Sequence, residues 1–358
     1  MSTTEPVRVA VIGGGANSEH EVGLASAASV ASALDPTRYA VVRLTIDRDG
    51  GWRSAGLPCS FPEAAAVLAS ADVVFPAVHG PDGEDGSLAA LAALAGVPVV
   101  GSPVGAGAIA MDKWATKLVA EASGVAVAPG TLLTRAEAPT VDAAALTESV
   151  GPLPWIVKPV AGGSSFGVSR VDTADELDVA LAEAFALDDR VLVERMVPGR
   201  EVDVAVLERP DGALVVGPPL EVLNAADGFF DADTKYDGSA RFVLPAPLTP
   251  VVGERIEAVA RTLFTRLGCA GLARVDCFVT PGGEVVLNEV NTMPGLTAQS
   301  QLPKMFASVG IDYPDLLSDL VETALRTTAR GDAVGRAAGC TVGAGPSTRS
   351  GTPVEAAR

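Results

Sequence analysis

Short apolar runs that end in glycines or polar turns alternate with helical patterns over the N-terminal third of the chain. Residues 8–12 (RVAVI) lead directly into three glycines, as in a parallel strand that is buried on both faces and ends at a ligand-facing loop. This alternation predicts an open parallel α/β sheet whose loops at the carboxyl ends of the strands bind ligand. The other elements expected here are helices at 22–34 and 87–95 and strands at 39–46, 72–78 and 97–100.

The pattern changes after residue 111. A helix at 112–123, a strand at 155–159, a helix at 174–186 and a strand at 191–194 predict a small α+β unit. Antiparallel strands are then expected at 202–207, 214–216, 242–245, 272–279 and 284–291, around a helix at 251–267. The predicted division is an N-terminal α/β domain at 1–111, a central subdomain at 112–201, a C-terminal α+β domain at 202–326 and a flexible tail at 327–358, which is rich in small residues.

Composition excludes several classes of protein. The 358 residues are 48% hydrophobic, which is ample for a folded core, and the net charge of -18 argues against a broad nucleic-acid or anionic-membrane surface. No apolar stretch approaches the ~20 residues that span a bilayer, and the N-terminus does not resemble a signal peptide. The four cysteines contain no C-x-x-C pair, so we expect reduced thiols and a cytoplasmic location.

The most specific local pattern lies on two predicted strands that contain Ala-Arg-Val-Asp at 273–276 and Asn-Glu-Val-Asn at 288–291. Arg274 and Asp276 share one face of their strand, and Glu289 and Asn291 share one face of theirs. If the intervening turn pairs Thr280 with Gly283, Arg274 lies opposite Glu289 and all four side chains project on one side. Two carboxylates and an amide oxygen suit Mg²⁺. The alternative is a buried ion-pair network without a metal.

A second pattern is Gly-Gly-Ser-Ser-Phe-Gly at residues 162–167, which follows the strand that carries Lys158. Glycines let the backbone approach an anion and serine hydroxyls add donors, so the loop can cradle phosphate, although alone it could equally be a surface hairpin. Glu194 and Glu201 flank a later turn, where they could accept hydrogen bonds from a nucleotide's amine and ribose hydroxyls. The P-loop motif is absent, which excludes that fold, and the lack of G-x-G-x-x-G makes a dinucleotide enzyme a weak alternative.

Together, these and other motifs resemble the D-alanine:D-alanine ligases of the ATP-grasp superfamily over residues 7–326. The resemblance implies an ATP-grasp fold in which two α+β domains hold ATP between them. The motifs that carry it, in order, are GGANSEHEV at 14–22, HGPDGEDG at 79–86, MDK at 111–113, VKP at 157–159 with its Gly-Ser loop, KY at 235–236, RVD at 274–276 and NEVNTMPG at 288–295.

The resemblance also implies a set of residues that bind ATP and metal. Asp276, Glu289 and Asn291 would hold two Mg²⁺ ions, with Mn²⁺ as a replacement, between the protein and the phosphates. The ATP-binding residues that it implies are Lys113, Lys158, Ser164, Ser165, Glu194, Val197, Glu201 and Lys235.

The reaction that the resemblance implies converts a first D-alanine into an acyl phosphate, from which the amine of a second D-alanine displaces phosphate, for peptidoglycan synthesis. Glu19 would bind the first ammonium with His79 nearby, and Ser300 with the Gln301 amide would bind the second carboxylate. Lys235 and Tyr236 would lie on a mobile loop that closes the site. The catalytic residues implied are Glu19, Ser164, Tyr236, Arg274 and the Gly295 amide, and Arg274 would also contact substrate.

Three positions depart from the family pattern: Gly23, Phe230 and Gln301. Gln301 lies near the second substrate's site and bears on its identity, whereas the Lys235–Tyr236 pair favours D-alanine over D-lactate. The alternatives left open are a D-alanine:D-serine or D-alanine:D-lactate ligase and a nucleotide-binding relative without catalysis. The expected partners are small molecules and, from the resemblance, a second copy of the chain, with neither nucleic acid nor membrane.

Overall fold

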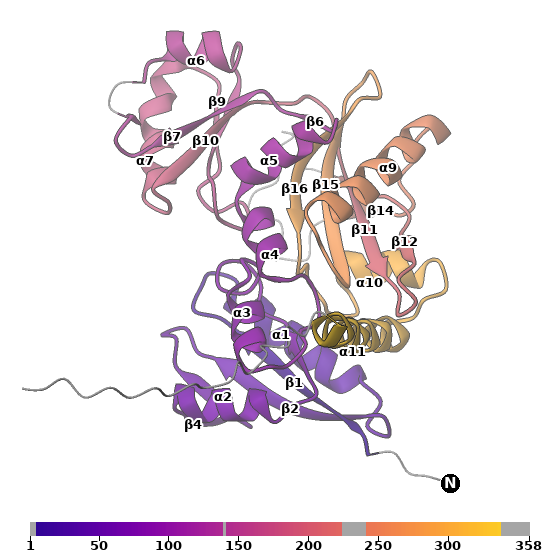
Figure 1. Ribbon diagram of the computed structural model, residues 1–358. Coiled ribbons are helices and arrows are strands. Elements are labelled where there is room, and N and C mark those ends of the chain that lie inside the picture. The colour runs from indigo at the N-terminus through magenta and orange to yellow at the C-terminus, as the bar shows by residue number, and fades with distance from the viewer. Residues whose placement is uncertain (1–4, 139–140, 224–240, 338–358) are drawn as a thin grey trace, which may run out of the picture.

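The computed structural model describes residues 5–138, 141–223 and 241–337, with side chains up to residue 326 (Figure 1). Three sheets organise this part of the chain. No helix within it combines the length and the apolar character needed to cross a bilayer. The three sheets agree with the predicted succession of an α/β domain and two α+β units.

The N-terminal sheet has the strand order β4-β3-β2-β1-β5. Its central strand β1 (Val7–Gly14) pairs in parallel with β2 (Tyr39–Ile46) and β5 (Val73–Pro76). Residues 9–12 are at most 1% exposed, which explains their unbroken apolar run. The strand predicted at 97–100 is reduced to one bridge between Val74 and Val99. The remaining elements are α1 (His20–Ala33), β3 (Trp52–Ser54), β4 (Leu57–Cys59), α2 (Phe61–Ala69) and α3 (Ser87–Leu94).

The central sheet is antiparallel, with the order β7-β10-β8-β9. Alternate residues of β8 separate its two faces. Trp155 and Val157 are buried in a core with α7, whereas Ile156 and Lys158 line a cleft on the other face. The elements are β7 (Gly130–Thr134), α6 (Ala143–Ser149), β8 (Trp155–Pro159), β9 (Ser169–Val171), the 3-10 helix η2 (Ala174–Glu176), α7 (Leu177–Phe185) and β10 (Arg190–Arg195).

The C-terminal sheet runs β14-β13-β11-β15-β16-β6, with β12 paired to β11. Side chains of α4, α5 and α9 share one core with it, and α5 leads into the edge strand β6. The elements are α4 (Val104–Met111), α5 (Lys113–Ala122), β6 (Ala126–Val127), β11 (Arg200–Glu208), β12 (Leu214–Val216), β13 (Leu220–Leu223), β14 (Arg241–Val243), α9 (Pro250–Arg266), β15 (Leu272–Val279) and β16 (Val285–Asn291).

Helices α10 (Gln301–Ala307) and α11 (Tyr313–Ala337) connect the first and third sheets. In Figure 1, α11 lies between them, and its Leu320 shares a core with Val9 of β1 and Leu207 of β11. The helix continues to Ala337 in place of the tail predicted from residue 327, because alanine and arginine extend a helix already held by its buried face. The domain division at 111, 201 and 326 stays a prediction.

Truncation of Leu320 tests this shared core. Leu320 is 1% exposed, so Leu320→Ala should lower the free energy of unfolding by about 2–5 kcal/mol, through lost burial and a cavity. Leu94→Ala is the control, because Leu94 is 88% exposed and its truncation should change stability little. Urea denaturation of both variants measures the difference, and equal midpoints would contradict the packing described for α11.

Candidate active site

The central and C-terminal sheets face one another across an open cleft of ≈ 1220 Å³. Its apolar part is lined by Ile156 of β8, Phe278 of β15 and Val197 of the loop between β10 and β11. A flat, mostly apolar ligand such as a purine base suits this part, since such ligands bind between apolar walls with few polar anchors. The charged lining consists of Lys113, Lys158, Glu194, Arg195, Glu201 and Glu289.

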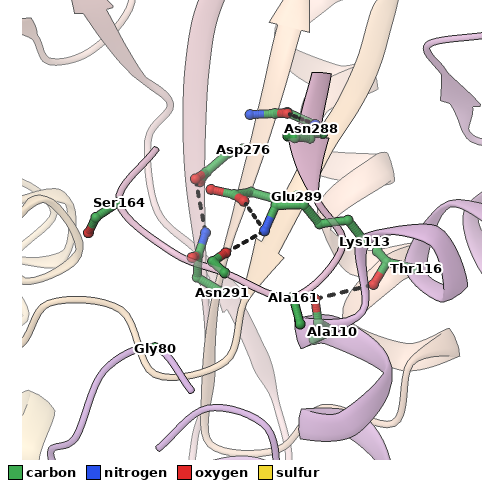
Figure 2. A network of polar contacts seen from close by, with 12 residues as sticks. Gly80, Ala110, Lys113, Thr116, Ala161, Ser164, Asp276, Asn288, Glu289 and Asn291 are labelled. Atoms are coloured by element: carbon green, nitrogen blue, oxygen red, sulfur yellow. Dashed lines mark hydrogen bonds and ion pairs between the residues drawn. The ribbon is translucent and has the colours of Figure 1, made fainter. Parts of the chain in front are cut away.

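Lys113 extends from the first turn of α5 to the opposite wall of the cleft. Its Nζ donates to the Gly162 carbonyl at 2.6 Å and lies 3.2 Å from Oε2 of Glu289 (Figure 2). The helix begins there because the Asp112 carboxylate caps it by accepting from the Ala115 amide. Lys113 therefore joins the Gly-Ser loop to the Glu289 carboxylate of β16.

Glu194 does not stand free to accept from a nucleotide. Its carboxylate is 4% exposed and lies between two lysines, with Lys158 Nζ 2.6 Å from Oε2 and Lys117 Nζ against Oε1. Burial opposes its ionisation, but the charges of Lys158 and Lys117 prevail and lower the pKa of Glu194. Glu194 thus positions two ammonium groups. The sequence interpretation missed Lys117, although it lies one helical turn after Lys113 and belongs to the few lysines of the chain.

The Gly-Ser loop between β8 and β9 is held in an uncommon backbone conformation. Ser164 and Ser165 have positive φ angles of 52° and 59°, which residues other than glycine, asparagine and aspartate adopt rarely. The loop lines the cleft from Gly162 onward, and Phe166 at its tip is 44% exposed. A strained turn of this kind directs backbone N–H groups to one side and suits an anion.

The pairing of β15 with β16 differs from the predicted register. Asp276 lies opposite Glu289, and Arg274 opposite Asn291 rather than Glu289, because a bulge follows Asp276 and the turn is longer than Thr280 to Gly283. Asn288 is the extra residue of this bulge. Glu289 and Asn288 therefore both line the cleft although they are consecutive. Periodicity alone could not reveal the bulge, because an inserted residue breaks the alternation on which that reasoning depends.

The predicted metal ligands do converge, and they are held by cations and amides of the protein. Asp276 accepts two hydrogen bonds of 2.7 Å from Arg274. It accepts a third, of 2.9 Å, from Asn291 Nδ2 (Figure 2). Within the described ranges no group of three or more His, Cys, Asp or Glu side chains is placed so that these residues alone could hold a metal ion. Two facing carboxylates and an amide nevertheless match the oxygen chemistry of Mg²⁺, which takes its other ligands from water and phosphate.

Glu19 lies where the N-terminal domain meets the Gly-Ser loop. Its Oε1 accepts from the Ser164 hydroxyl at 2.6 Å, and the residue is 8% exposed. A Cβ at Gly80 or at Gly163 would lie 2.4 Å from Oε2, so a larger residue at either position would displace the carboxylate from its present place. Glu19 and Ser164, 145 positions apart in sequence, are therefore brought together by segments from two sheets.

His79 lies behind the site rather than on its surface. It is 2% exposed, its Nδ1 is 2.7 Å from the Met293 carbonyl oxygen, and its Nε2 is 2.8 Å from Oγ of Ser26. Burial lowers its pKa, so the ring is neutral. This placement favours a structural contact with the turn after β16 over direct contact with substrate.

Glu84, which the sequence interpretation did not single out, lies between two loops of the site. Its carboxylate accepts from the amides of Gly80 at 2.9 Å and Met293 at 3.3 Å. Burial, assisted by the nearby charge of Glu19, raises the pKa of Glu84 to about 8. The signal was present in the sequence, because Glu84 belongs to the HGPDGEDG motif.

The remaining predicted residues fall into two groups. Ser300 is the N-cap residue of α10, directly before Gln301, and its Oγ accepts from the Thr297 amide at 3.1 Å. A Cβ at Gly295 would lie 3.1 Å from the same Oγ, so this turn is closely packed. Lys235 and Tyr236, with the stretch 224–236 predicted to close the site and its Phe230, lie outside the described residues.

The cleft lies between the sheets of two α+β units, and its lining combines lysines, a glycine-rich loop and the Glu289 carboxylate. This arrangement defines the ATP-grasp class. Comparison with family models agrees. The model described as D-ala D-ala ligase C-terminus matches residues 119–322, and that described as D-ala D-ala ligase N-terminus matches 8–64 and 58–102. The chain belongs to the D-alanine–D-alanine ligase family.

Individual relatives are similar over nearly their whole length. The D-alanine–D-alanine ligase of Mycobacterium avium (strain 104) is 40% identical, over 91% of this chain and 98% of that protein. Among solved structures, the VanG D-Ala:D-Ser ligase of Enterococcus faecalis has a TM-score of 0.80 at 33% identity, covering 89% of this chain and 100% of that one. The D-alanine-D-alanine ligase of Coxiella burnetii has a TM-score of 0.80 at 31% identity, covering 93% and 98%.

Removal of Lys117 tests the buried ion-pair cluster. Lys117→Met should lower the free energy of unfolding by about 3 kcal/mol, because it leaves part of the buried Glu194 charge without its partner. Arg48→Met is the matched control, since Arg48 pairs with Glu21 at the surface and such pairs contribute at most about 1 kcal/mol. Chemical denaturation distinguishes the two, and similar losses would argue against a special role for the cluster.

Replacement of Glu84 tests its raised pKa, about 8 against ~4.3 for a free glutamate. Between these values the folded chain binds a proton that the unfolded chain does not, so this group makes the parent less stable as pH rises. Glu84→Gln removes that loss, so the variant should be more stable than the parent by about 5 kcal/mol near pH 9, with little advantage near pH 5. Urea denaturation across this range measures it, and parallel stability curves would show that the pKa is not raised.

Proposed function

We propose that the chain joins two D-alanine molecules into D-alanyl-D-alanine at the expense of ATP, for peptidoglycan precursor synthesis. The observation that carries the proposal is the convergence of Lys113, Lys158 and Glu289 on one cleft, with Asp276 opposite Glu289 and the buried Glu19 beside the Gly-Ser loop. The names of relatives that match this chain over nine tenths of its length agree with it.

ATP would lie between the two sheets. The base would contact the apolar lining near Val197, with Glu201 placed to accept from the ribose hydroxyls, and the phosphates would extend toward Lys113, Lys158 and the Gly-Ser loop. Ser164 and Ser165 would cover the phosphates with backbone and hydroxyl donors. Lys235 would join this set from the stretch outside the described residues.

Asp276, Glu289 and Asn291 would hold two Mg²⁺ ions, with Mn²⁺ as a replacement. When bound, the ions would neutralise phosphate charge and orient the transferred group. For this, Arg274 must share or release the carboxylate of Asp276. Asp203 offers Arg274 a second carboxylate, with its Oδ2 3.8 Å from Nε.

The first D-alanine would bind with its ammonium at Glu19. Its carboxylate attacks the γ-phosphorus of ATP, ADP leaves, and an acyl phosphate forms. The amine of the second D-alanine then attacks the carbonyl carbon, loses a proton, and phosphate leaves. Arg274 and the Gly295 amide would stabilise the negative oxygen of the tetrahedral intermediate. Ser164 and Tyr236 would orient the reacting groups.

The second amino acid would bind by its carboxylate to Ser300 and the Gln301 amide, near the start of α10. A D-serine or D-lactate acceptor is the competing assignment, and the likeness to a D-Ala:D-Ser ligase keeps the serine case open to experiment. We also propose a cytoplasmic location, which the unpaired thiols of Cys59, Cys269 and Cys277 favour. A homodimer stays a prediction.

The decisive measurement is ATP-dependent phosphate release with a panel of amino acids. Phosphate release should require Mg²⁺ and D-alanine, and L-alanine should not support it. With D-alanine as first substrate, D-alanine should outcompete D-serine and D-lactate as acceptor, and mass spectrometry identifies the product. A predominant mixed product would reassign the second substrate, whereas equal release with L-alanine would overturn the stereochemical assignment.

A variant pair tests the metal ligands. Asp276→Asn should reduce kcat/KM by about 100-fold or more, because Mg²⁺ would lose a carboxylate ligand and the transferred phosphoryl group the cation that neutralises it. Asp175→Asn is the control, since Asp175 is exposed in η2, and it should retain full activity. Undiminished turnover of Asp276→Asn would remove the metal argument.

A further inference from the structure

A chain of hydrogen bonds connects the N-terminal domain to the turn that follows β16. It runs from the Leu296 amide to Ser26 Oγ at 3.3 Å, from Ser26 to Nε2 of His79 at 2.8 Å, and from Nδ1 of His79 to the Met293 carbonyl at 2.7 Å. Ser26 is 0% exposed and His79 is 2% exposed. The proposed reaction assigns no task to Ser26, although it is a buried polar group beside the site.

Every member of this chain has a fixed hydrogen-bonding role. The Met293 carbonyl can only accept, so Nδ1 of His79 carries the proton and Nε2 of the neutral ring accepts. The Ser26 hydroxyl therefore donates to the ring, and its oxygen accepts from the Leu296 amide. Burial, which lowers the pKa of His79, keeps the ring neutral and the direction of the chain unchanged.

The two ends of this series of hydrogen bonds lie on either side of the Gly295 peptide group, which has a role in the proposed reaction. Met293 and Leu296 lie on either side of Pro294 and Gly295, so one contact precedes the Gly295 amide and one follows it. Glu84 adds two bonds on the same side, from the Met293 amide at 3.3 Å and from the Thr292 hydroxyl at 3.2 Å. The turn is thus fixed by side chains and backbone of the N-terminal domain, not by the C-terminal sheet alone.

We propose that Ser26 and His79 are positioning residues that hold the Gly295 amide in the orientation needed to stabilise the tetrahedral intermediate. The inference rests on the proposed ligase function, because only a reaction with a developing oxyanion requires this orientation. A preorganised donor costs no reorganisation during the reaction, and losing one such donor reduces kcat by about 10²–10³-fold. Substitution of Ser26 would loosen the Gly295 amide rather than remove it, so a smaller loss of kcat is expected.

Ser26→Ala tests the proposal by kinetics. We expect kcat to fall about 10- to 100-fold, with KM for ATP within about twofold, because the base and ribose of ATP are proposed to bind near Val197 and Glu201, away from the turn. Affinity for a phosphinate dipeptide, whose tetrahedral phosphorus replaces the reacting carbonyl, should fall with kcat. Ser26→Cys, which keeps the size and a weak donor, should be intermediate. Unchanged kcat in Ser26→Ala, or equal losses in ATP and phosphinate affinity, would overturn the proposal.

Thr323→Val provides the matched control. Thr323 is 5% exposed in α11 and donates to the Glu208 carbonyl at 3.1 Å, far from the reaction in sequence and outside the lining of the cleft. Its loss should cost stability as the loss of Ser26 does, without a fall in kcat. A fall in kcat that follows stability in both variants would mean that Ser26 is structural only.

Hydrogen exchange separates this proposal from the proposed function. In Ser26→Ala the Leu296 amide loses its acceptor, so exchange in residues 292–297 should accelerate while exchange in β16 stays unchanged. If the parent chain releases no phosphate with D-alanine, the ligase function fails whatever the exchange shows. If the parent is active but neither exchange nor kcat responds to Ser26→Ala, the positioning role fails and the function stands.

Discussion

Buried charges that must be partnered control the arrangement of the site. Glu194 is held between Lys117 and Lys158, Lys113 reaches Glu289, and Arg274 grips Asp276. An isolated charge in this interior would cost several kcal/mol, so the two sheets can approach only in positions that keep each charge paired. The same pairing holds the lysines at the cleft wall, where phosphate binding requires them. Stability and the proposed chemistry thus impose the same geometry.

Much of the architecture could be predicted from the sequence because hydrophobic periodicity is local. The buried run at β1, the change of pattern after residue 111 and the strands that carry Asp276 and Glu289 all follow from spacing that a single segment contains. The candidate site could be predicted for a related reason, since its residues lie in short glycine-containing motifs. Glu19 and Ser164 meet in space, as two independently predicted motifs of one family should.

The features that local spacing could not reveal depend on packing between distant segments. The bulge beside Asp276 changes the register, because Leu287 and Val290 both face the core beneath the sheet. The contact between Glu194 and Lys117 could not be predicted, because only tertiary packing brings the two residues together, whereas the role of Glu194 in ATP binding stays a prediction. A flexible tail was predicted from residue 327, whereas α11 continues to Ala337, since a composition rich in small residues is compatible both with a helix and with a tail.

The contact between Arg274 and Asp276 does not by itself exclude a metal, because it is one part of a larger group of charges. The carboxylates of Asp203 and Asp276 lie beside Arg274, and that of Glu289 lies beside Lys113. Carboxylates directly beside the place proposed for the phosphates would repel ATP. A divalent cation between carboxylates and phosphates would offset both charges. The grouping of these carboxylates is therefore what the proposed site for metal and nucleotide together requires.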